Sequence, residues 1–267
     1  MRWILAILTL FGVGSVEAES PPFSHDLLDG VLQAYVDEAG RIDYAALKKA
    51  RAPLDTYMER LSQTSPHSNP DLFPCAQHQL AYWINAYNAC VLRRVLDAFP
   101  VKSVADIGGL DGFFKEAKYT IGSEKMTLDD IENTIIRPRY KDPRIHFAVN
   151  CAARSCPALG RSAFTGENLD AQLDAATRKA LANPLHVRID RAANTVHLTK
   201  IMEWFKGDFV EWIPRDQGDV PEQATLLDYL KLYLAGADAK YVAEHPDLGI
   251  VFTEYDWASN ASVAKAP

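Results

Sequence analysis

Arg144-Ile-His-Phe-Ala-Val-Asn-Cys-Ala-Ala-Arg-Ser-Cys-Pro157 is the stretch that decides how this chain is interpreted. The alternation of side chains over 145–150 predicts a short buried strand that runs into a turn. The stretch brings a histidine, an asparagine and two cysteines together in a chain that has four cysteines. Such a combination is typical of three kinds of site: a thiol active site, a disulfide, or a metal site.

The first 18 residues have the features of a signal peptide. Arg2 supplies a positive charge, and Trp3 to Val13 is an apolar run shorter than the roughly 20 residues that span a bilayer. Small residues precede the bond after Ala18, where we expect cleavage. No later stretch is long and apolar enough to insert into a membrane. We therefore expect a soluble mature protein that is periplasmic or secreted.

The composition bounds the function and the number of domains. A net charge of −7 disfavours nucleic acid and anionic membranes as partners. There is no internal repeat and no glycine-rich phosphate loop. The loops predicted at 62–71 and 215–223 are too short for domain linkers, so we expect a single globular domain over 19–267.

The spacing of apolar residues predicts a chain dominated by helices. Helices are expected at 24–36, 43–49, 53–61, 74–99, 127–137, 168–181, 201–205 and 225–234. Short strands are expected at 145–150 and 250–255 and in hairpins near 119–125 and 187–198, while 101–118 is expected to be irregular. The predicted class is therefore α+β, a helix-rich domain with a small, mostly antiparallel sheet.

Glu132 falls on the apolar side of its predicted helix, four residues from both Leu128 and Ile136. A carboxylate that faces a core is unfavourable by several kcal/mol unless a partner compensates it. Two explanations remain open at this level. Glu132 pairs with an arginine or lysine for structural reasons, or it orients a histidine or acts as a base.

His146 and Cys151 are the candidate base and nucleophile. On a strand His146 and Asn150 would share one face, and a thiolate at a strand end can be stabilised by free backbone amides. Five residues of extended strand cover about 16 Å, so His146 reaches Cys151 only if the chain bends after Asn150. If it does not, Asn150, His78 or His197 must take the partner role.

The cysteines allow two further interpretations. Cys151 and Cys156 are close enough in sequence for a disulfide, which an exported protein tolerates. Together with His146, and with Glu132 as a possible fourth ligand, they also form a weak zinc pattern. Cys75 and Cys90, if both lie on the long helix, are roughly 22 Å apart and cannot bridge, so we expect buried free thiols. Cys75 could pair only if it lies before the helix.

Asn85 and Asn88 lie one turn apart on the long predicted helix, beside Trp83. Buried asparagines usually bond to loop backbone, although an asparagine can also polarise an oxyanion or line a polar cleft. We therefore keep Trp83, Asn85, Asn88 and Asn150 as candidate binding residues. Two clusters rich in aromatic and acidic residues, 200–209 and 254–260, are expected to serve packing and capping, with Asp256 and Asn260 fixing the C-terminal chain.

The chain resembles the domain-of-unknown-function 547 family. Four elements carry the resemblance: Trp83-Ile-Asn-Ala-Tyr-Asn88, Leu128-Asp-Asp-Ile-Glu132 with Arg137, the segment His146 to Pro157, and Glu254-Tyr-Asp-Trp-Ala-Ser-Asn260. Residues 200–209 match a weaker fifth element. The family commonly has glycine after the first cysteine, where this chain has Ala152.

The resemblance implies a fold related to papain-like and transglutaminase-like thiol enzymes, with Cys151, His146 and Glu132 as the catalytic set. The function expected from it is an exported thiol-dependent hydrolase or acyltransferase without a cofactor or metal. The alternative is a non-catalytic module that binds a peptide or a thiol ligand and contains a Cys151–Cys156 disulfide. A small molecule or peptide is the expected ligand in either case, and the sequence specifies neither the substrate nor the oligomeric state.

Overall fold

The computed structural model describes residues 21–213 and 224–262. The signal peptide predicted at 1–18, with its cleavage site, and the loop predicted at 215–223 lie outside the described residues. The described chain is rich in helices and has two small sheets, which confirms the predicted α+β class. Within these residues, no helix combines the length and the apolar character that crossing a membrane requires.

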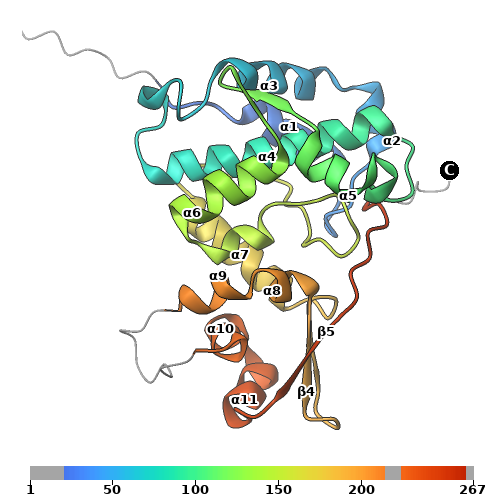
Figure 1. Cartoon of the computed structure of the whole chain (residues 1–267), viewed down its shortest axis with the longest axis vertical. Coiled ribbons are helices and arrows are strands. Elements are labelled where there is room, and N and C mark those ends of the chain that lie inside the picture. The colour runs from blue at the N-terminus through green and yellow to red at the C-terminus, as the bar shows by residue number, and fades with distance from the viewer. Residues whose placement is uncertain (1–20, 214–223, 263–267) are drawn as a thin grey trace, which may run out of the picture.

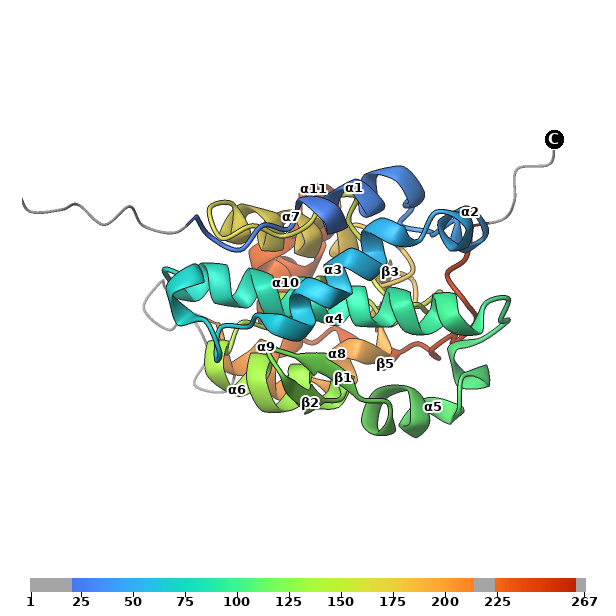
Figure 2. The ribbon, with the colours of Figure 1, turned by 90° about the horizontal axis from the view of Figure 1, so that it is seen from above.

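Helix α4, Ala76–Ala98, runs through the middle of the larger part of the molecule (Figure 2). All of its residues from Leu80 to Leu92 are buried, because other elements cover it on every side. Helices α2 (Tyr44–Lys49), α3 (Ala52–Gln63) and α7 (Leu169–Leu181) pack on α4, and α1 (Asp26–Tyr35) packs on α3. The predicted helices of this region are all present, with ends that differ by at most two residues.

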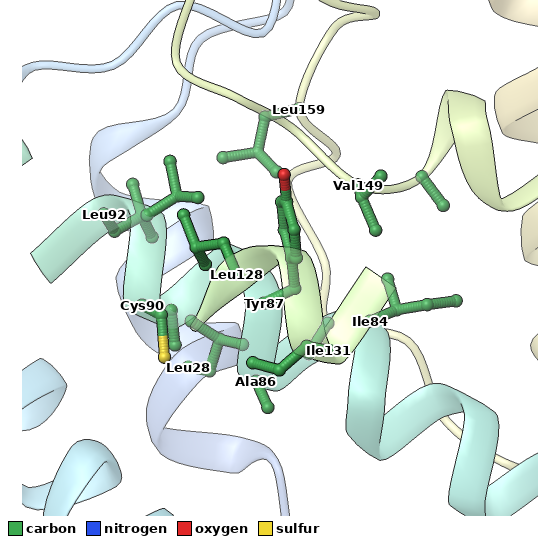
Figure 3. Packing of buried hydrophobic residues seen from close by; sticks show 14 of the residues in the cluster. Leu28, Ile84, Ala86, Tyr87, Cys90, Leu92, Leu128, Ile131, Val149 and Leu159 are labelled. Carbon is green, nitrogen blue, oxygen red and sulfur yellow. The ribbon is translucent and has the colours of Figure 1, made fainter. Parts of the chain in front are cut away.

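The core around α4 is continuous with the segment that carries the candidate site. Figure 3 shows Tyr87 of α4 among Ile84, Leu128, Ile131 and Val149, with its hydroxyl pointing away from the helix. These side chains come from three separated segments, and each of them is at most 8% exposed. The walls of the site are therefore held by the main hydrophobic core.

A short hairpin follows an irregular series of helical turns. The turns are η2 (Val104–Asp106), α5 (Gly109–Asp111) and η3 (Gly112–Glu116), where the sequence predicted no regular structure. Strands β1 (Tyr119–Ile121) and β2 (Glu124–Met126) then pair antiparallel through Gly122 and Ser123. Both turn residues have positive φ, as two-residue hairpin turns require, and the predicted hairpin is confirmed.

A second, smaller core forms the lower part of the molecule in Figure 1. Strand β3 (Val187–Asp190) pairs antiparallel with β4 (Thr195–Leu198), and β4 pairs parallel with β5 (Gly249–Phe252). Four helices pack beside this sheet: α8 (Lys200–Trp204), α9 (Lys206–Glu211), α10 (Leu226–Tyr233) and α11 (Gly236–Glu244). The sequence predicted α8, α10 and the strands, but it missed α9 and α11.

The chain after β5 returns to the larger part of the molecule (Figure 1). It pairs with three separate segments through the isolated bridges Ser103–Ala258, Ala153–Ser259 and Ile42–Ala261. Asn260 accepts a hydrogen bond from the Tyr44 hydroxyl at 3.1 Å and donates to Asn150 at 3.2 Å. The C-terminal segment thus joins the two cores, and Asn260 fixes it as predicted.

The strand predicted at 145–150 is wrong. Pro143–Phe147 forms a 3₁₀ helix, η5, whose first turn is capped by Asp142. Its side chains are buried on all sides, and Ala148 and Val149 donate backbone bonds to Ile145 instead of pairing with a strand. A short apolar run cannot be assigned from its period alone. Because the chain folds back on itself here, the extended-strand distance between His146 and Cys151 does not apply.

The helix predicted to end at Arg137 continues to Tyr140. Its first part winds as a π helix, η4 (Asp130–Ile136), and α6 (Arg137–Tyr140) follows with Pro138 in its first turn. Pro138 has no N–H to donate to the preceding turn, and it lies where the π-helical segment meets the α-helical one. The cap is as predicted, since the Thr127 hydroxyl accepts the backbone N–H of Asp130 at 3.0 Å.

Candidate functional site

One pocket gathers the three residues that the sequence singled out as a catalytic set. It has a volume of about 210 Å³ and is lined by Glu132, His146 and Cys151 together with Cys156. Its walls are largely apolar and include the aromatic side chains of Phe114, Trp204, Phe205, Tyr255 and Trp257. A pocket of this kind, apolar with a few convergent polar groups, is typical of a small-molecule or active site.

His146 is held by a carboxylate that the sequence did not identify. Its Nε2 lies 2.8 Å from Oδ2 of Asp208 on α9, and Arg137 donates to both oxygens of Asp208 at 2.6 and 2.9 Å. The ring also stacks on Phe205, with centroids 4.0 Å apart and an interplanar angle of 17°. The buried imidazole is therefore fixed in orientation by one hydrogen bond and one stacking contact.

The charge of Asp208 is stabilised by these contacts. Partial burial disfavours the ionised carboxyl, but the hydrogen bonds with His146 and Arg137 outweigh it and hold the pKa of Asp208 well below its usual range. Because Nε2 of His146 faces an ionised carboxylate, this nitrogen carries the proton. The other ring nitrogen, Nδ1, has no hydrogen-bond partner among residues 21–213 and 224–262.

Glu132 stands on the opposite side of the imidazole from Asp208. Its Oε1 is 3.7 Å from Nδ1 of His146, beyond a normal hydrogen bond. Burial, followed by the charge of Glu132, raises the pKa of Tyr87 and of Tyr255. Both phenols therefore stay protonated, and they can donate hydrogen bonds into the pocket.

Glu132 projects from the π-helical segment η4 and is largely buried, with 13% of its side chain exposed. The sequence predicted this burial from α-helical spacing. It left a pairing with arginine or lysine open, but Arg137 pairs with Asp208 instead. π-helical turns are frequent at functional sites because they change the direction in which a side chain points.

Cys151 and Cys156 form a disulfide. The Tyr255 hydroxyl lies 3.0 Å from Sγ of Cys151 and 3.2 Å from Sγ of Cys156. Neither sulfur is a thiolate ligand in this state, and the described residues contain no group of three or more metal-ligating side chains in a metal-binding arrangement. The polar chemistry of the pocket thus surrounds a disulfide.

Ala152 has a left-handed backbone, with φ of +62°. The resemblance described above implies glycine at this position. A residue with a Cβ is disfavoured there by roughly 1–2 kcal/mol, so the observed conformation accounts for glycine at this position. The turn is held by Asn150, whose Oδ1 accepts the N–H of Ala152 at 2.9 Å and whose Nδ2 donates to Pro157.

The four candidate binding residues do not line this pocket. Asn85 exchanges two hydrogen bonds with the backbone of Phe164, and Asn88 bonds to the backbone of Ala148 and Asn150. Trp83 is fully buried in the core. Asn150 is the one residue of the four that borders a second hollow, which Cys156 also lines. In this structure all four serve packing or hold loops against α4.

The spare histidines lie elsewhere in the structure. His197 lies on β4, and His78 bonds to Cys75 and Glu167. Cys75 precedes α4 and is exposed, so the expectation that it is buried is wrong, whereas Cys90 is a buried free thiol as predicted. Neither histidine lines the pocket that contains Cys151.

Comparison with known proteins confirms the predicted resemblance. The segment 73–180 matches the family model described as a protein of unknown function, DUF547. This segment belongs to the DUF547 family. The DUF547 match includes Trp83–Asn88, the Glu132 helix and the stretch 144–157, whereas Asp208 and Tyr255 lie beyond it. The chain matched no curated protein and no solved structure.

Asp208 is the site residue that sequence reasoning missed. It lies 62 residues after His146, inside a cluster rich in aromatic and acidic residues that was assigned to packing and capping. One signal was present in the sequence. Residues 200–209 resemble a weak element of the DUF547 family, and packing or helix capping does not by itself require such a resemblance. A carboxylate in such an element is a reasonable candidate to orient a histidine.

Proposed function

We propose that the pocket is the active site of an exported thiol-dependent hydrolase or acyltransferase related to papain-like and transglutaminase-like enzymes. Cys151 is the nucleophile once the Cys151–Cys156 disulfide has been reduced. The observation that carries the proposal is the Arg137–Asp208–His146 chain, which ends in a pocket that also contains Cys151. A carboxylate, a histidine and a cysteine in that relation are the parts of a thiol acyl-transfer site.

Each side chain has one role in this proposal. A thiol reductant first opens the disulfide, and His146 accepts the proton of Cys151 as its sulfur attacks an acyl carbonyl. The leaving group takes that proton, and water or another acceptor then releases the acyl group. The Tyr255 hydroxyl, 3.0 Å from Sγ of Cys151, supplies a donor for the developing oxyanion. Asp208 orients the imidazole, and Glu132 adds a second carboxylate beside it.

A second candidate is a non-catalytic module, which the disulfide itself favours. With both sulfurs joined there is no nucleophile, and the aromatic walls and protonated phenols suit a small ligand or the side chain of a peptide. The two functions differ in a single property: whether Cys151, when free, is acylated.

Acylation of Cys151 tests the proposal in a Cys75→Ser background, which removes the exposed free thiol. Cys156→Ser frees Cys151 without reductant, whereas Cys151→Ser removes the nucleophile, and both variants lack the disulfide. With p-nitrophenyl acetate we expect a stoichiometric burst and acetyl-Cys151 by mass spectrometry for Cys156→Ser. The parent protein should give the burst only after reduction, and Cys151→Ser should give none.

Asp208→Asn in the Cys156→Ser protein examines the proposed positioning role. Loss of an oriented base typically lowers the rate about 10²–10⁴-fold, and we expect slower acylation with the fold unchanged. Asp238→Asn, an exposed carboxylate paired with Arg191, is the matched control. A folded Cys156→Ser protein that is not acylated at any pH would leave only the binding module.

A further inference from the structure

A second constellation of reactive side chains lies at the start of α4, away from the pocket. Sγ of Cys75 is 3.1 Å from Nδ1 of His78, and Nε2 of His78 is 2.9 Å from Oε1 of Glu167. Cys75, His78 and Glu167 thus form a linear thiol–imidazole–carboxylate array. Eleven helical residues separate Ala76 from Tyr87 in the pocket wall, a rise of about 16 Å.

The imidazole of His78 is held in place by its surroundings. A Cβ added at Gly166 would lie 2.3 Å from Cγ and Nδ1 of His78, so the ring packs directly on the glycine backbone. Only 16% of the His78 side chain is exposed, compared with 63% for Glu167. Any side chain larger than glycine at position 166 would displace the ring from Cys75.

The array favours a thiolate at Cys75. With Nε2–H of His78 donating to Glu167, Nδ1 either accepts the S–H of Cys75 or, in the imidazolium, donates to its thiolate. The hydrogen bond with His78, followed by the backbone amides of His78 and Gln77 at the helix N-terminus, lowers the pKa of the Cys75 thiol. Partial burial disfavours a charged imidazole, but the bonds to Cys75 and Glu167 outweigh it and raise the pKa of His78.

The other charged groups around the array support this charge distribution. Backbone hydrogen bonding, followed by the bond from His78, lowers the pKa of Glu167, so its carboxylate is ionised. His25 of the adjoining segment would repel a protonated His78, but burial lowers the pKa of His25 to about 4. Near pH 7 His25 is therefore neutral, and His78 is the cation beside Cys75.

We propose that Cys75 is a surface nucleophile that undergoes thiol–disulfide exchange with small disulfides, activated by His78 and Glu167. Exchange requires a thiolate that an incoming disulfide can reach, and Cys75 is exposed. A groove of about 480 Å³ is bordered by His78, Gly166 and Glu167, so two members of the array face it while Cys75 lies outside its lining.

The exchange is chemically balanced. The Cys75 thiolate attacks one sulfur of a disulfide R–S–S–R, and the Cys75–S–R bond forms as the original S–S bond breaks. The departing thiolate takes the electron pair and then a proton, for which the Nδ1–H of His78 is the nearest donor. Cys75 is oxidised and the small disulfide is reduced, so no further oxidant is needed.

The rate of Cys75 modification as a function of pH tests the proposal on the intact protein. Iodoacetamide reports the thiolate fraction, oxidised glutathione reports exchange, and peptide mapping assigns the modified cysteine. We expect the midpoint of the rate profile below the value of about 8.5 for a free thiol. His78→Gln should move the midpoint up to that value and slow both reactions at pH 6.5 at least about tenfold.

Two more variants keep the test decisive. Gly166→Ala retains all three reactive groups but displaces the ring, and it should slow the reaction in the same direction as His78→Gln. Glu167→Gln should raise the midpoint, whereas Glu124→Gln, an exposed carboxylate elsewhere, should not. Protection of buried Cys90 reports that each variant is folded. An ordinary midpoint in the parent protein, or equal rates in a folded His78→Gln protein, would overturn the proposal.

The inference does not depend on the function proposed for the pocket. Removing the disulfide with Cys151→Ser or Cys156→Ser should leave the profile of Cys75 unchanged. A shift of that profile in either variant would show that the two sites are coupled and would contradict the separate role assigned to Cys75.

Discussion

At the scale of single residues, the backbone of Ala152 shows how the site departs from local preference. Its left-handed φ of +62° follows directly after Cys151 and is held by the Asn150 side chain and by the N–H of Asn260, which bonds to the Ala152 carbonyl. The surrounding hydrogen bonds determine the conformation, and alanine occupies it with some strain. The sequence comparison noted the missing glycine, but it could not reveal the positive φ that makes glycine favourable.

Ala152→Gly should therefore stabilise the protein. Relief of the left-handed strain, reduced by the greater freedom of glycine in the unfolded chain, is expected to raise the free energy of unfolding by about 0.5–1 kcal/mol. Urea unfolding followed by circular dichroism measures this change. Ala153→Gly is the matched control: Ala153 is buried without a positive φ, and glycine there should destabilise. Equal effects of the two substitutions would contradict the explanation.

At the scale of elements, α4 organises both candidate sites. Its N-terminus presents Cys75 and His78, and its buried middle presents Tyr87 to the pocket and Asn88 to the 148–150 segment. The sequence predicted this helix correctly, because its apolar residues form a long run and residues at its two ends mark where it stops. The same approach failed at 145–150, where η5 and the turn after it are stabilised by side chains of distant elements.

Asn88 connects α4 to the segment that carries Cys151. It donates to the carbonyl of Ala148 at 3.0 Å and accepts the N–H of Asn150 at 2.8 Å. Asn88→Ala would leave both buried backbone groups without partners, so we expect a loss of about 2–4 kcal/mol in the free energy of unfolding. Gln77→Ala, an exposed amide on the same helix, should change it by less than about 0.5 kcal/mol. Denaturant unfolding of the two variants distinguishes these outcomes.

At the scale of the whole molecule, a buried histidine makes stability depend on pH. His186, in the smaller core region, is 1% exposed, and burial lowers its pKa to about 4. The unfolded chain binds a proton to this histidine below about pH 6.5, whereas the folded protein does not do so until about pH 4. The free energy of unfolding should therefore fall as pH decreases through this window, by up to about 3 kcal/mol from this residue.

Other titratable groups also change how the free energy of unfolding depends on pH, in directions that follow from their pKa shifts. His25 has a pKa lowered to about 4 and adds to the loss, whereas the raised pKa of His78 opposes it. The low pKa of Asp208 stabilises the folded protein throughout this window, and that contribution is lost only as the pH falls through and below the ordinary carboxyl range. Urea unfolding at pH 7, 6 and 5 should show a smaller slope for His186→Gln than for the parent protein. Exposed His67→Gln serves as the control, and parallel slopes for all three proteins would refute the assignment.

The sequence by itself determined the helix-rich class, the long central helix, both hairpins and the DUF547 motifs that contain Glu132, His146 and Cys151. These follow from local periodicity, turn residues and the order of short motifs along the chain. Tertiary structure alone decided the partners. Asp208 holds His146 across 62 residues, and Glu167 holds His78 across 89. Hydrogen bonds of this kind depend on how separate elements pack, and no local pattern records that packing.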